Sequence, residues 1–188
     1  PTKEDWFELA EYLGGTIDSD QIFIEEPNTV GSTLKQVGVS DSTWTSGNSD
    51  ATNSTGFSAN GTGYRMPDTG VFGGRGQQGN YWGSTEGIGP FWVSVGNTYT
   101  DLKNAYGVDN YGVAVRLVKT DSDIGSGSMQ DADNNVYDTV LIGNQVWTVQ
   151  DLVTTKYGDG SPISEVTEDS TWISTSDGAY CYYNNEDS

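Results

Sequence analysis

The clearest periodic pattern of the chain lies at its start. Four apolar residues follow the i, i+3, i+4, i+7 spacing of one helix face: Trp6, Leu9, Ala10 and Leu13. Thr2 stands where an N-cap residue belongs, and Gly14-Gly15 interrupts the pattern at its far end. The sequence therefore predicts an amphipathic helix over residues 3–13.

Shorter patterns later in the chain predict strands. Residues 136–142 and 145–149 flank Gly143-Asn144, a two-residue loop of the kind that favours a tight hairpin. Residues 113–118 are apolar on nearly both faces, which predicts a buried central strand. Two further strands are expected over 91–95 and 179–183, and short helical turns over 102–105 and 149–154.

The rest of the chain is rich in turn-forming and aromatic residues. Residues 60–110 contain many Gly, Asn and aromatic side chains without a strong period, and such long stretches are usually functional or internally packed. Residues 120–130 are small and polar, which is typical of a linker. One clear helix among many short strands predicts an α+β fold with a loop-rich mixed sheet and an aromatic core.

The charge of the chain excludes several partners. Its 188 residues, enough for one domain or two small ones, include 27 Asp and Glu against 8 Lys and Arg, a formal net charge of −19. A chain this acidic repels phosphate, so nucleic acid and anionic lipid surfaces are not expected partners. No run approaches the roughly 18 apolar residues of a membrane span, so membrane insertion is not expected either.

Composition also argues against catalysis. The chain has no His and one Cys, so Ser–His and Cys–His nucleophile systems cannot form. Carboxylate pairs such as Glu25-Glu26 arise by chance among 27 acids and predict a solvated surface. Cys181 lies in the strand-like segment AYCYY, which predicts a buried structural thiol. We therefore expect no enzymatic activity.

One acidic turn suggests a metal site. Asp131, Asp133 and Asn135 alternate along the chain and carry the oxygen ligands that calcium prefers. The EF-hand pattern is not met, because Val136 stands at its sixth position and Ile142 at its twelfth. Calcium at these three residues is one candidate, and an ordinary turn leading into the following strand is the other.

Several segments resemble one bacterial family. The matching segments are PTKEDWFELAEYLGG (1–15), ATNSTGFSANGTGYR (51–65), YWGSTE (81–86), GVAVRLVK (112–119), VYDTVLIGNQVWTVQDLVTTKYGDGSPI (136–163) and GAYCYYNNEDS (178–188). They are similar to motifs of the Fibrobacter succinogenes major paralogous domain, within the wider C-type-lectin-like group. The resemblance implies a C-type-lectin-like fold and a place outside the bacterial cell or on its surface. It implies no established activity.

The order of these segments departs from the family. Residues 1–119 resemble the C-terminal part of the family domain and 131–188 its N-terminal part, with the linker 120–130 between them, so the halves are reversed and the family's connecting segment is absent. The chain is then a cut from a tandem array, a permuted domain, or a unit whose C-terminal half completes a neighbouring copy. A strand that has lost its sheet partner readily pairs with another chain, and a tail-to-head contact of this kind builds filaments unless a ring closes.

A ligand face is predicted in the aromatic region. Tyr, Asn and Gly are residues that binding loops use, because tyrosine offers rigid contact area and asparagine adaptable hydrogen bonds. The candidate ligand-binding residues are Tyr99, Tyr106, Asp109, Asn110 and Tyr111. Trp82 and Trp92 are expected in the core instead. Glu26-Pro27-Asn28 matches a tripeptide that mannose-type lectins use around calcium, but its place after the helix favours an ordinary turn.

Two functions remain open at this level. The first is a non-catalytic extracellular structural or adhesive module that assembles head-to-tail with neighbouring copies of itself. The alternative is a lectin-like domain that binds carbohydrate or protein, such as a host or cell-surface ligand, through the loops of residues 80–111.

Overall fold

The computed structural model describes residues 1–39, 43–85, 89–119 and 127–186, and these residues form an α+β fold. A five-stranded sheet has the order β2-β1-β3-β4-β5 and is antiparallel except between β1 and β3. Its strands are β1 (Thr62–Arg65), β2 (Phe72–Arg75), β3 (Gln78–Gly83), β4 (Phe91–Gly96) and β5 (Lys103–Tyr106).

A four-stranded antiparallel sheet has the order β6-β9-β8-β7. Its strands are β6 (Val118–Lys119), β7 (Ser128–Gln130), β8 (Val136–Ile142) and β9 (Gln145–Thr148). The elements that follow are β10 (Ser164–Glu165), α3 (Asp169–Ser174), β11 (Ala179–Tyr180) and the 3-10 helix η1 (Tyr183–Asn185), with β10 and β11 paired in parallel. Because β6 precedes the predicted linker 120–130, β7 lies within it, and β8 and β9 follow it, both halves of the chain contribute to one sheet.

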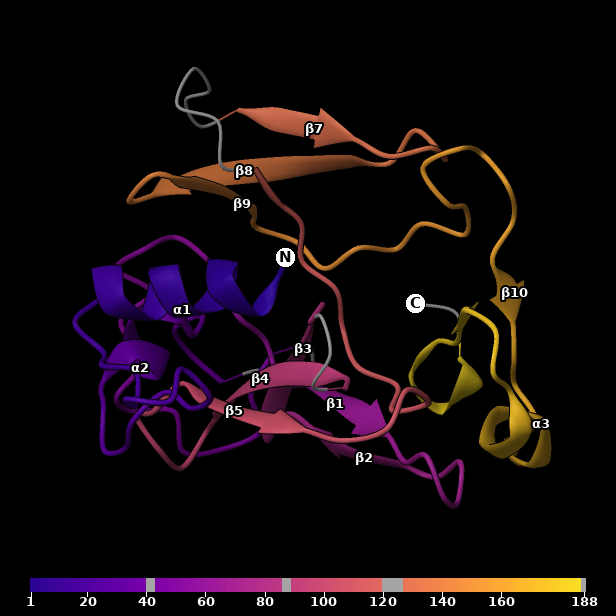
Figure 1. Cartoon of the computed structure of the whole chain (residues 1–188), viewed down its shortest axis with the longest axis horizontal. Coiled ribbons are helices and arrows are strands. Elements are labelled where there is room, and N and C mark those ends of the chain that lie inside the picture. Colours follow the sequence, from indigo (N-terminus) through magenta and orange to yellow (C-terminus); the bar gives the residue numbers. More distant parts are fainter. Residues whose placement is uncertain (40–42, 86–88, 120–126, 187–188) are drawn as a thin grey trace.

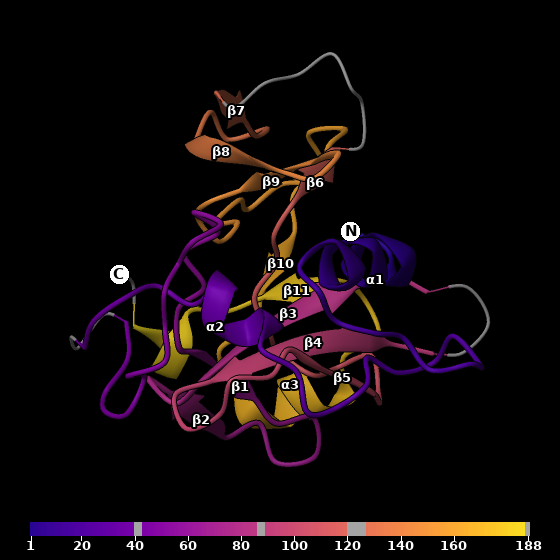
Figure 2. The same ribbon diagram turned by 90° about the vertical axis from the view of Figure 1, so that its left-hand side faces the viewer.

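The predicted N-terminal helix is confirmed as α1 (Lys3–Tyr12). Thr2 Oγ1 accepts a hydrogen bond from Asp5 N at 3.1 Å, and Thr2 N donates to Asp5 Oδ2 at 2.7 Å, which completes a capping box. Figures 1 and 2 show α1 between the β8–β9 hairpin and the five-stranded sheet. A second, short helix, α2 (Val30–Leu34), lies on the same side of that sheet in Figure 1.

One aromatic core joins the helix and both sheets. The ring centroid of Trp6 lies 4.5 Å from Trp147, 5.9 Å from Phe57 and 6.1 Å from Tyr81. All four side chains are buried. Aromatic residues carry the largest burial areas, so this cluster supplies much of the hydrophobic stabilisation of the fold.

The hairpin and one further strand also follow the sequence. Strands β8 and β9 pair around Gly143, whose φ of +61° suits the left-handed conformation of the tight turn. The strand predicted over 91–95 is confirmed as β4. The C-type-lectin-like part of the fold prediction stays a prediction.

The predicted central strand over 113–118 is wrong. Only Val118 of this segment enters a named strand, and Ala114 makes an isolated bridge with Tyr81. The segment crosses from one sheet to the other: Ala114 N donates to Asn80 O at 3.0 Å, whereas Leu117 O accepts from Thr148 N at 3.0 Å. Its backbone partners are thus divided between two sheets.

Other local predictions also change. Residues 102–105 were expected to be helical, but they overlap β5, whose residues pair with β4. Residues 149–154 contain no helix, and the strand predicted over 179–183 ends after Tyr180. Of the predicted linker, 120–126 lies outside the described residues, and 128–130 forms β7 against β8. For 102–105 and 128–130, pairing with the neighbouring strands β4 and β8 decides the outcome.

Among the described residues, none of the helices has both the length and the apolar character needed to cross a bilayer.

Candidate functional site

The described residues on the two sides of 120–126 form two portions, a first portion within 1–119 and a second portion of residues 127–186, which meet around two buried arginines. Arg116 of the first portion is fully buried. Its Nη1 donates to Phe57 O at 2.8 Å within the first portion, and to Thr148 O at 2.8 Å and Val149 O in the second. Its Nε pairs with the carboxylate of Asp151, also in the second portion. One guanidinium thereby links the backbones of the two portions.

Arg65, at the end of β1, holds the segment before α3 in the same way. The side chain is 1% exposed. Its Nη1 donates to Val166 O at 2.6 Å, and its Nη2 donates to Thr167 O at 2.8 Å and to Asp169 Oδ1 at 2.9 Å. The guanidinium carbon lies 4.5 Å from the centroid of the Trp172 ring, within the range of a cation–π contact. All four partners belong to the second portion.

A third set of contacts joins α1 to the β8–β9 hairpin. Gln145 Nε2 donates to Asp5 O at 2.9 Å, and Trp147 packs against Trp6. Strand β6 pairs with β9 through Val118 opposite Trp147 and Lys119 opposite Val146. The second portion is therefore docked by backbone pairing, apolar packing and buried charge together.

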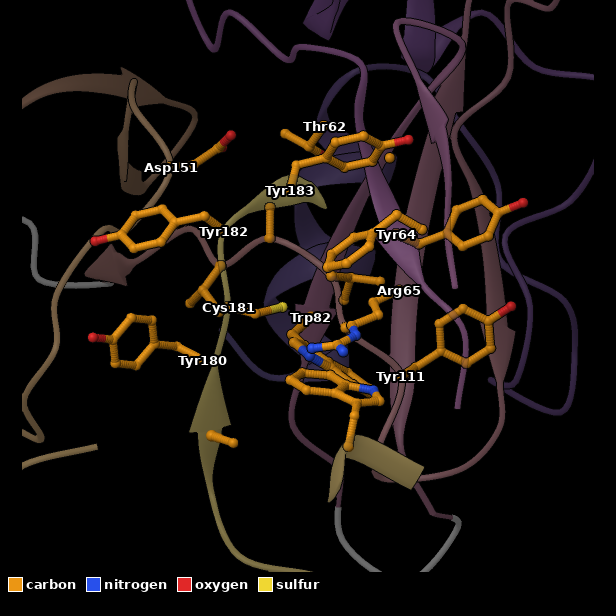
Figure 3. Close-up of a pocket in the computed structure, with 18 of the residues that line it drawn as sticks. Thr62, Tyr64, Arg65, Trp82, Tyr111, Asp151, Tyr180, Cys181, Tyr182 and Tyr183 are labelled. Carbon is orange, nitrogen blue, oxygen red and sulfur yellow. The ribbon is translucent and has the colours of Figure 1, made fainter. Parts of the chain in front are cut away.

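A cleft of about 640 Å³ lies where the two portions meet. Residues 60–65 and 109–115 of the first portion line it, and so do 151–154 and 175–183 of the second. Figure 3 shows Tyr180 and Tyr182 projecting from one side of their segment toward the side where Asp151 lies. The volume falls within the range of ordinary small-molecule sites.

Three of the five predicted ligand-binding residues line this cleft: Asp109, Asn110 and Tyr111. Asn110 also has a structural role, because its Nδ2 donates to Pro67 O at 3.0 Å and its carbonyl accepts from Trp172 Nε1 at 2.8 Å. Tyr111 stacks on Trp92 with ring centroids 4.9 Å apart. Burial, followed by the nearby Tyr64 and Asp68, raises the pKa of Tyr111.

The other two predicted residues lie away from the cleft. Tyr99 packs against Gly96, where a Cβ would come within 2.2 Å of the ring, and Lys103 Nζ lies 5.0 Å from its centroid. The Tyr106 hydroxyl donates to Ile22 O at 2.9 Å. Both tyrosines therefore join the five-stranded sheet to neighbouring segments. Trp82 and Trp92, expected in the core, are half-buried and contact each other edge to face at 6.1 Å.

The proposed calcium ligands make a hydrogen-bonded turn. Asp131 Oδ1 accepts from the backbone N–H groups of Asp133 at 2.8 Å and Asn135 at 2.9 Å, and Asp131 Oδ2 accepts from the Tyr137 hydroxyl at 2.7 Å. Asp133 Oδ1 pairs with Lys156 Nζ at 2.9 Å. Over the described residues, no group of three or more His, Cys, Asp or Glu side chains is placed to hold a metal. Calcium at this turn stays a prediction, and it would compete with these bonds.

This turn predicts a pH dependence of stability. The Lys156 ammonium, followed by the Thr155 backbone N–H, holds the pKa of Asp133 well below its ordinary value of 3.8. A lowered folded-state pKa contributes stability above the unfolded-state pKa, and the contribution is lost as pH falls through the folded one. We expect Asp133→Asn to be less stable than the natural chain at neutral pH. We also expect a shallower loss of its unfolding free energy below about pH 4, measured by urea denaturation at several pH values.

The control for this prediction is Glu8→Gln on the exposed face of α1. The interpretation is wrong if Asp133→Asn and Glu8→Gln give the same dependence of unfolding free energy on pH.

The other two residues considered as candidates, Asn28 and Cys181, are held by contacts within the fold. Asn28 of the Glu26-Pro27-Asn28 tripeptide accepts through Oδ1 from Val30 N at 3.1 Å and Leu102 N at 2.9 Å, so it joins two loops, as an ordinary turn residue does. Cys181 is half-buried rather than fully buried, and it lines the cleft. Burial raises its pKa, against the opposing influence of Arg65, so the thiol form is favoured.

The residues that hold the two portions together were not singled out from the sequence. Arg116 lies in the apolar run VAVRLV. A charged residue between apolar neighbours is the feature of the sequence that could have indicated a buried arginine here. Arg65 follows a glycine-rich, aromatic stretch that offers no such contrast. Apart from Asp151 and Asp169, their hydrogen-bond partners are backbone carbonyls, which every residue type carries and which therefore leave no signal in the sequence.

A protein-family model, described as the Fibrobacter succinogenes major domain, matches residues 1–119 of the chain. The matched range ends at the last residue of β6. No curated protein and no solved structure matches the chain.

Proposed function

The chain belongs to the Fibrobacter succinogenes major domain family. From this premise we propose that it is a non-catalytic structural or adhesive module on the outside of a bacterial cell. In this proposal the modules assemble head-to-tail, and the second portion of one copy docks on the first portion of the next.

One observation carries the proposal: the two most deeply buried arginines of the family-matched portion have their partners in the second portion. Without that portion, Arg65 and Arg116 would lose their bonds to the carbonyls of Val166 and Thr148. Without it, Arg65 would keep only Gly70 O. Arg116 would keep the carbonyls of Phe57 and Ser58. A docked second portion therefore supplies most of the partners of these two guanidiniums, which supports the proposal.

The docking contacts do not depend on which molecule supplies the second portion. The hydrogen bonds of Arg65 and Arg116, the β6–β9 pairing and the Trp6–Trp147 contact all form between residues far apart in the chain. A short connection favours docking within one molecule, because it gives an effective concentration of about 1 mM. At higher local concentrations, as on a crowded surface, exchange between copies becomes favourable, and such a contact propagates into a filament.

A mixed disulfide tests the exchange directly. Lys119 of β6 lies opposite Val146 of β9, and Cα atoms of such pairs are about 4.5–5.5 Å apart, within the range of a disulfide. One chain carries Lys119→Cys and the other Val146→Cys, both with Cys181→Ser. We expect a disulfide-linked heterodimer after joint refolding, in a yield that rises with protein concentration, measured on non-reducing gels.

The matched control replaces Val146→Cys by Glu8→Cys, on an exposed face of α1 that does not meet β6. The proposal is wrong if the test pair forms no more heterodimer than the control pair at every concentration.

A second measurement needs no cysteine. An Arg116→Met chain has a damaged first portion and an intact second, whereas a Trp147→Ala chain has the reverse. If the two chains exchange their second portions, the first portion of the Trp147→Ala chain binds the second portion of the Arg116→Met chain, and this interface carries neither substitution. The refolded mixture should then unfold at a higher urea concentration than either chain alone. A mixture whose unfolding curve is the average of the separate curves would count against head-to-tail docking.

A second candidate function is ligand binding, as expected for the loops of residues 80–111. What favours it is the position of Asp109, Asn110 and Tyr111 on the wall of the cleft. Tyr99 and Tyr106 do not support it, since their rings and hydroxyls are used in packing.

A further inference from the structure

The cleft is a property of the docked chain, because its walls come from both portions. The first portion contributes residues 60–65 and 109–115, and the second contributes 151–154 and 175–183. Any molecule bound there contacts both portions. Its chemistry can be inferred from the side chains that line the walls.

Aromatic rings stand on both walls. On the second portion, Tyr180 and Tyr182 contact each other edge to face at 5.9 Å, and they project from the same side of their segment (Figure 3). Trp82 and Tyr64 of the first portion also line the cleft, and each is half-buried, but they lie on the other side of this segment from the side toward which Tyr180 and Tyr182 project (Figure 3). Rings of this kind offer flat apolar area together with polar tips, which suits a ligand that has both apolar and polar faces.

The charges at the cleft disfavour an anion. The donors of Arg65 are already used by Gly70 O, Val166 O, Thr167 O and Asp169. Among the described residues that line the cleft, one is an exposed cation, Arg75, whose guanidinium carbon lies 5.1 Å from the Tyr183 ring. The acids Asp109, Asp177 and Glu186 line it as well, and the whole chain carries a formal net charge of −19, so the acids outnumber this cation. Phosphorylated, sulfated or uronic acid ligands would be repelled.

The uncharged polar groups favour a ligand that both donates and accepts hydrogen bonds. Thr62, Thr175 and Ser176 line the cleft, and each hydroxyl can act as donor or acceptor. Asn60 also lies on the wall, and its Oδ1 is buried without a hydrogen-bond partner among the described residues. A cationic ligand only donates, so it would leave the donor groups of these side chains unused. Sugar hydroxyls match both kinds of group.

We propose that the composite cleft binds an uncharged oligosaccharide, with Tyr180 and Tyr182 as the aromatic surface and the hydroxyl and amide groups that line the cleft as hydrogen-bonding partners. This site goes beyond the structural role proposed above. Binding at this cleft requires a docked second portion but not the assembly of several copies. The binding proposal and the assembly proposal can therefore fail independently of each other.

Titration calorimetry on the full chain, at a concentration where it is monomeric, tests the proposal. The probes are short neutral gluco-, xylo-, manno- and galacto-oligosaccharides, with oligogalacturonate as the acidic comparison and oligolysine as the cationic one. We expect at least one neutral probe to bind, and neither charged probe to bind as tightly at physiological salt.

Tyr182→Ala is expected to weaken binding of that neutral probe by about tenfold or more, as loss of an aromatic anchor does. Tyr182→Phe keeps the ring and should retain most of the affinity, so it separates loss of the ring from loss of the fold. The matched control is Tyr12→Ala, since Tyr12 is 65% exposed on α1 and lies outside the cleft. Circular dichroism checks that each variant is folded.

Three results would overturn the proposal. One is the absence of binding by every neutral probe up to millimolar concentration. Another is tighter binding of oligogalacturonate or oligolysine than of any neutral sugar. The third is equal affinity of the natural chain and a folded Tyr182→Ala variant for the neutral probe.

Discussion

Replacing Arg116 by methionine is expected to lower the free energy of unfolding by about 3–5 kcal/mol, the cost of breaking a buried ion pair. The side chain is fully buried, and its loss leaves the carbonyls of Thr148 and Phe57 without their donor. Because whole domains are stable by only about 5–15 kcal/mol, this change removes a large share of the total. Urea denaturation followed by tryptophan fluorescence measures it.

Two further variants define the cause of this loss. Arg116→Lys keeps the charge but not the planar guanidinium that reaches several acceptors. Its free energy of unfolding should therefore lie between those of the natural chain and Arg116→Met. Arg75→Met removes an exposed cation that lies 5.1 Å from the Tyr183 ring, and it should cost only about 0.5–1 kcal/mol. Equal effects of Arg116→Met and Arg75→Met would contradict the role assigned to Arg116.

The second large effect is expected for Trp147→Ala, at about 3–5 kcal/mol of unfolding free energy. Trp147 is fully buried in β9, with its ring 4.5 Å from Trp6 and 5.7 Å from Phe57. The substitution leaves a cavity at the centre of the contact between the two portions. Chemical denaturation measures the loss, and limited proteolysis should show earlier cleavage after Lys156, which lies within the second portion.

The control for Trp147→Ala is Val136→Ala in the same sheet, whose side chain is 64% exposed and should change stability by no more than about 0.5 kcal/mol. A Trp147→Ala chain as stable as the Val136→Ala chain would show that the second portion is not held by the core. Trp147 and Arg116 both contact Phe57, so their effects should not be additive in the double variant.

The candidate site could be predicted only in part. Asp109, Asn110 and Tyr111 were selected because residue types such as Tyr and Asn favour binding surfaces, and they line the cleft. The same argument selected Tyr99 and Tyr106, which lie elsewhere, because composition does not distinguish an exposed ring from one packed on a neighbouring strand. For the segment that contains Tyr180 and Tyr182, the sequence pattern predicts a strand and gives no indication of a binding surface.

The fold followed the sequence wherever the signal was local. Helix α1 and the hairpin around Gly143 depend on residues within a few positions of one another, through a capping box, an apolar stripe and a tight turn. Residues 103–106 form β5 because they pair with the preceding strand β4, and residues 113–118 form no continuous strand because their backbone partners, such as Asn80 and Thr148, lie more than thirty positions away in the chain. Local preference cannot register such partners.

The amino-acid sequence by itself determined the helix, the hairpin, the acidic charge, the family and the lack of histidine. Only the tertiary structure decided that residues 127–186 dock within the same chain, that Arg65 and Arg116 are buried, and that a cleft opens between the portions. The reason is physical: the first set follows from composition and from contacts between near neighbours. The second depends on backbone carbonyls and rings brought together from distant parts of the chain, for example across the 140 positions between Asp5 and Gln145.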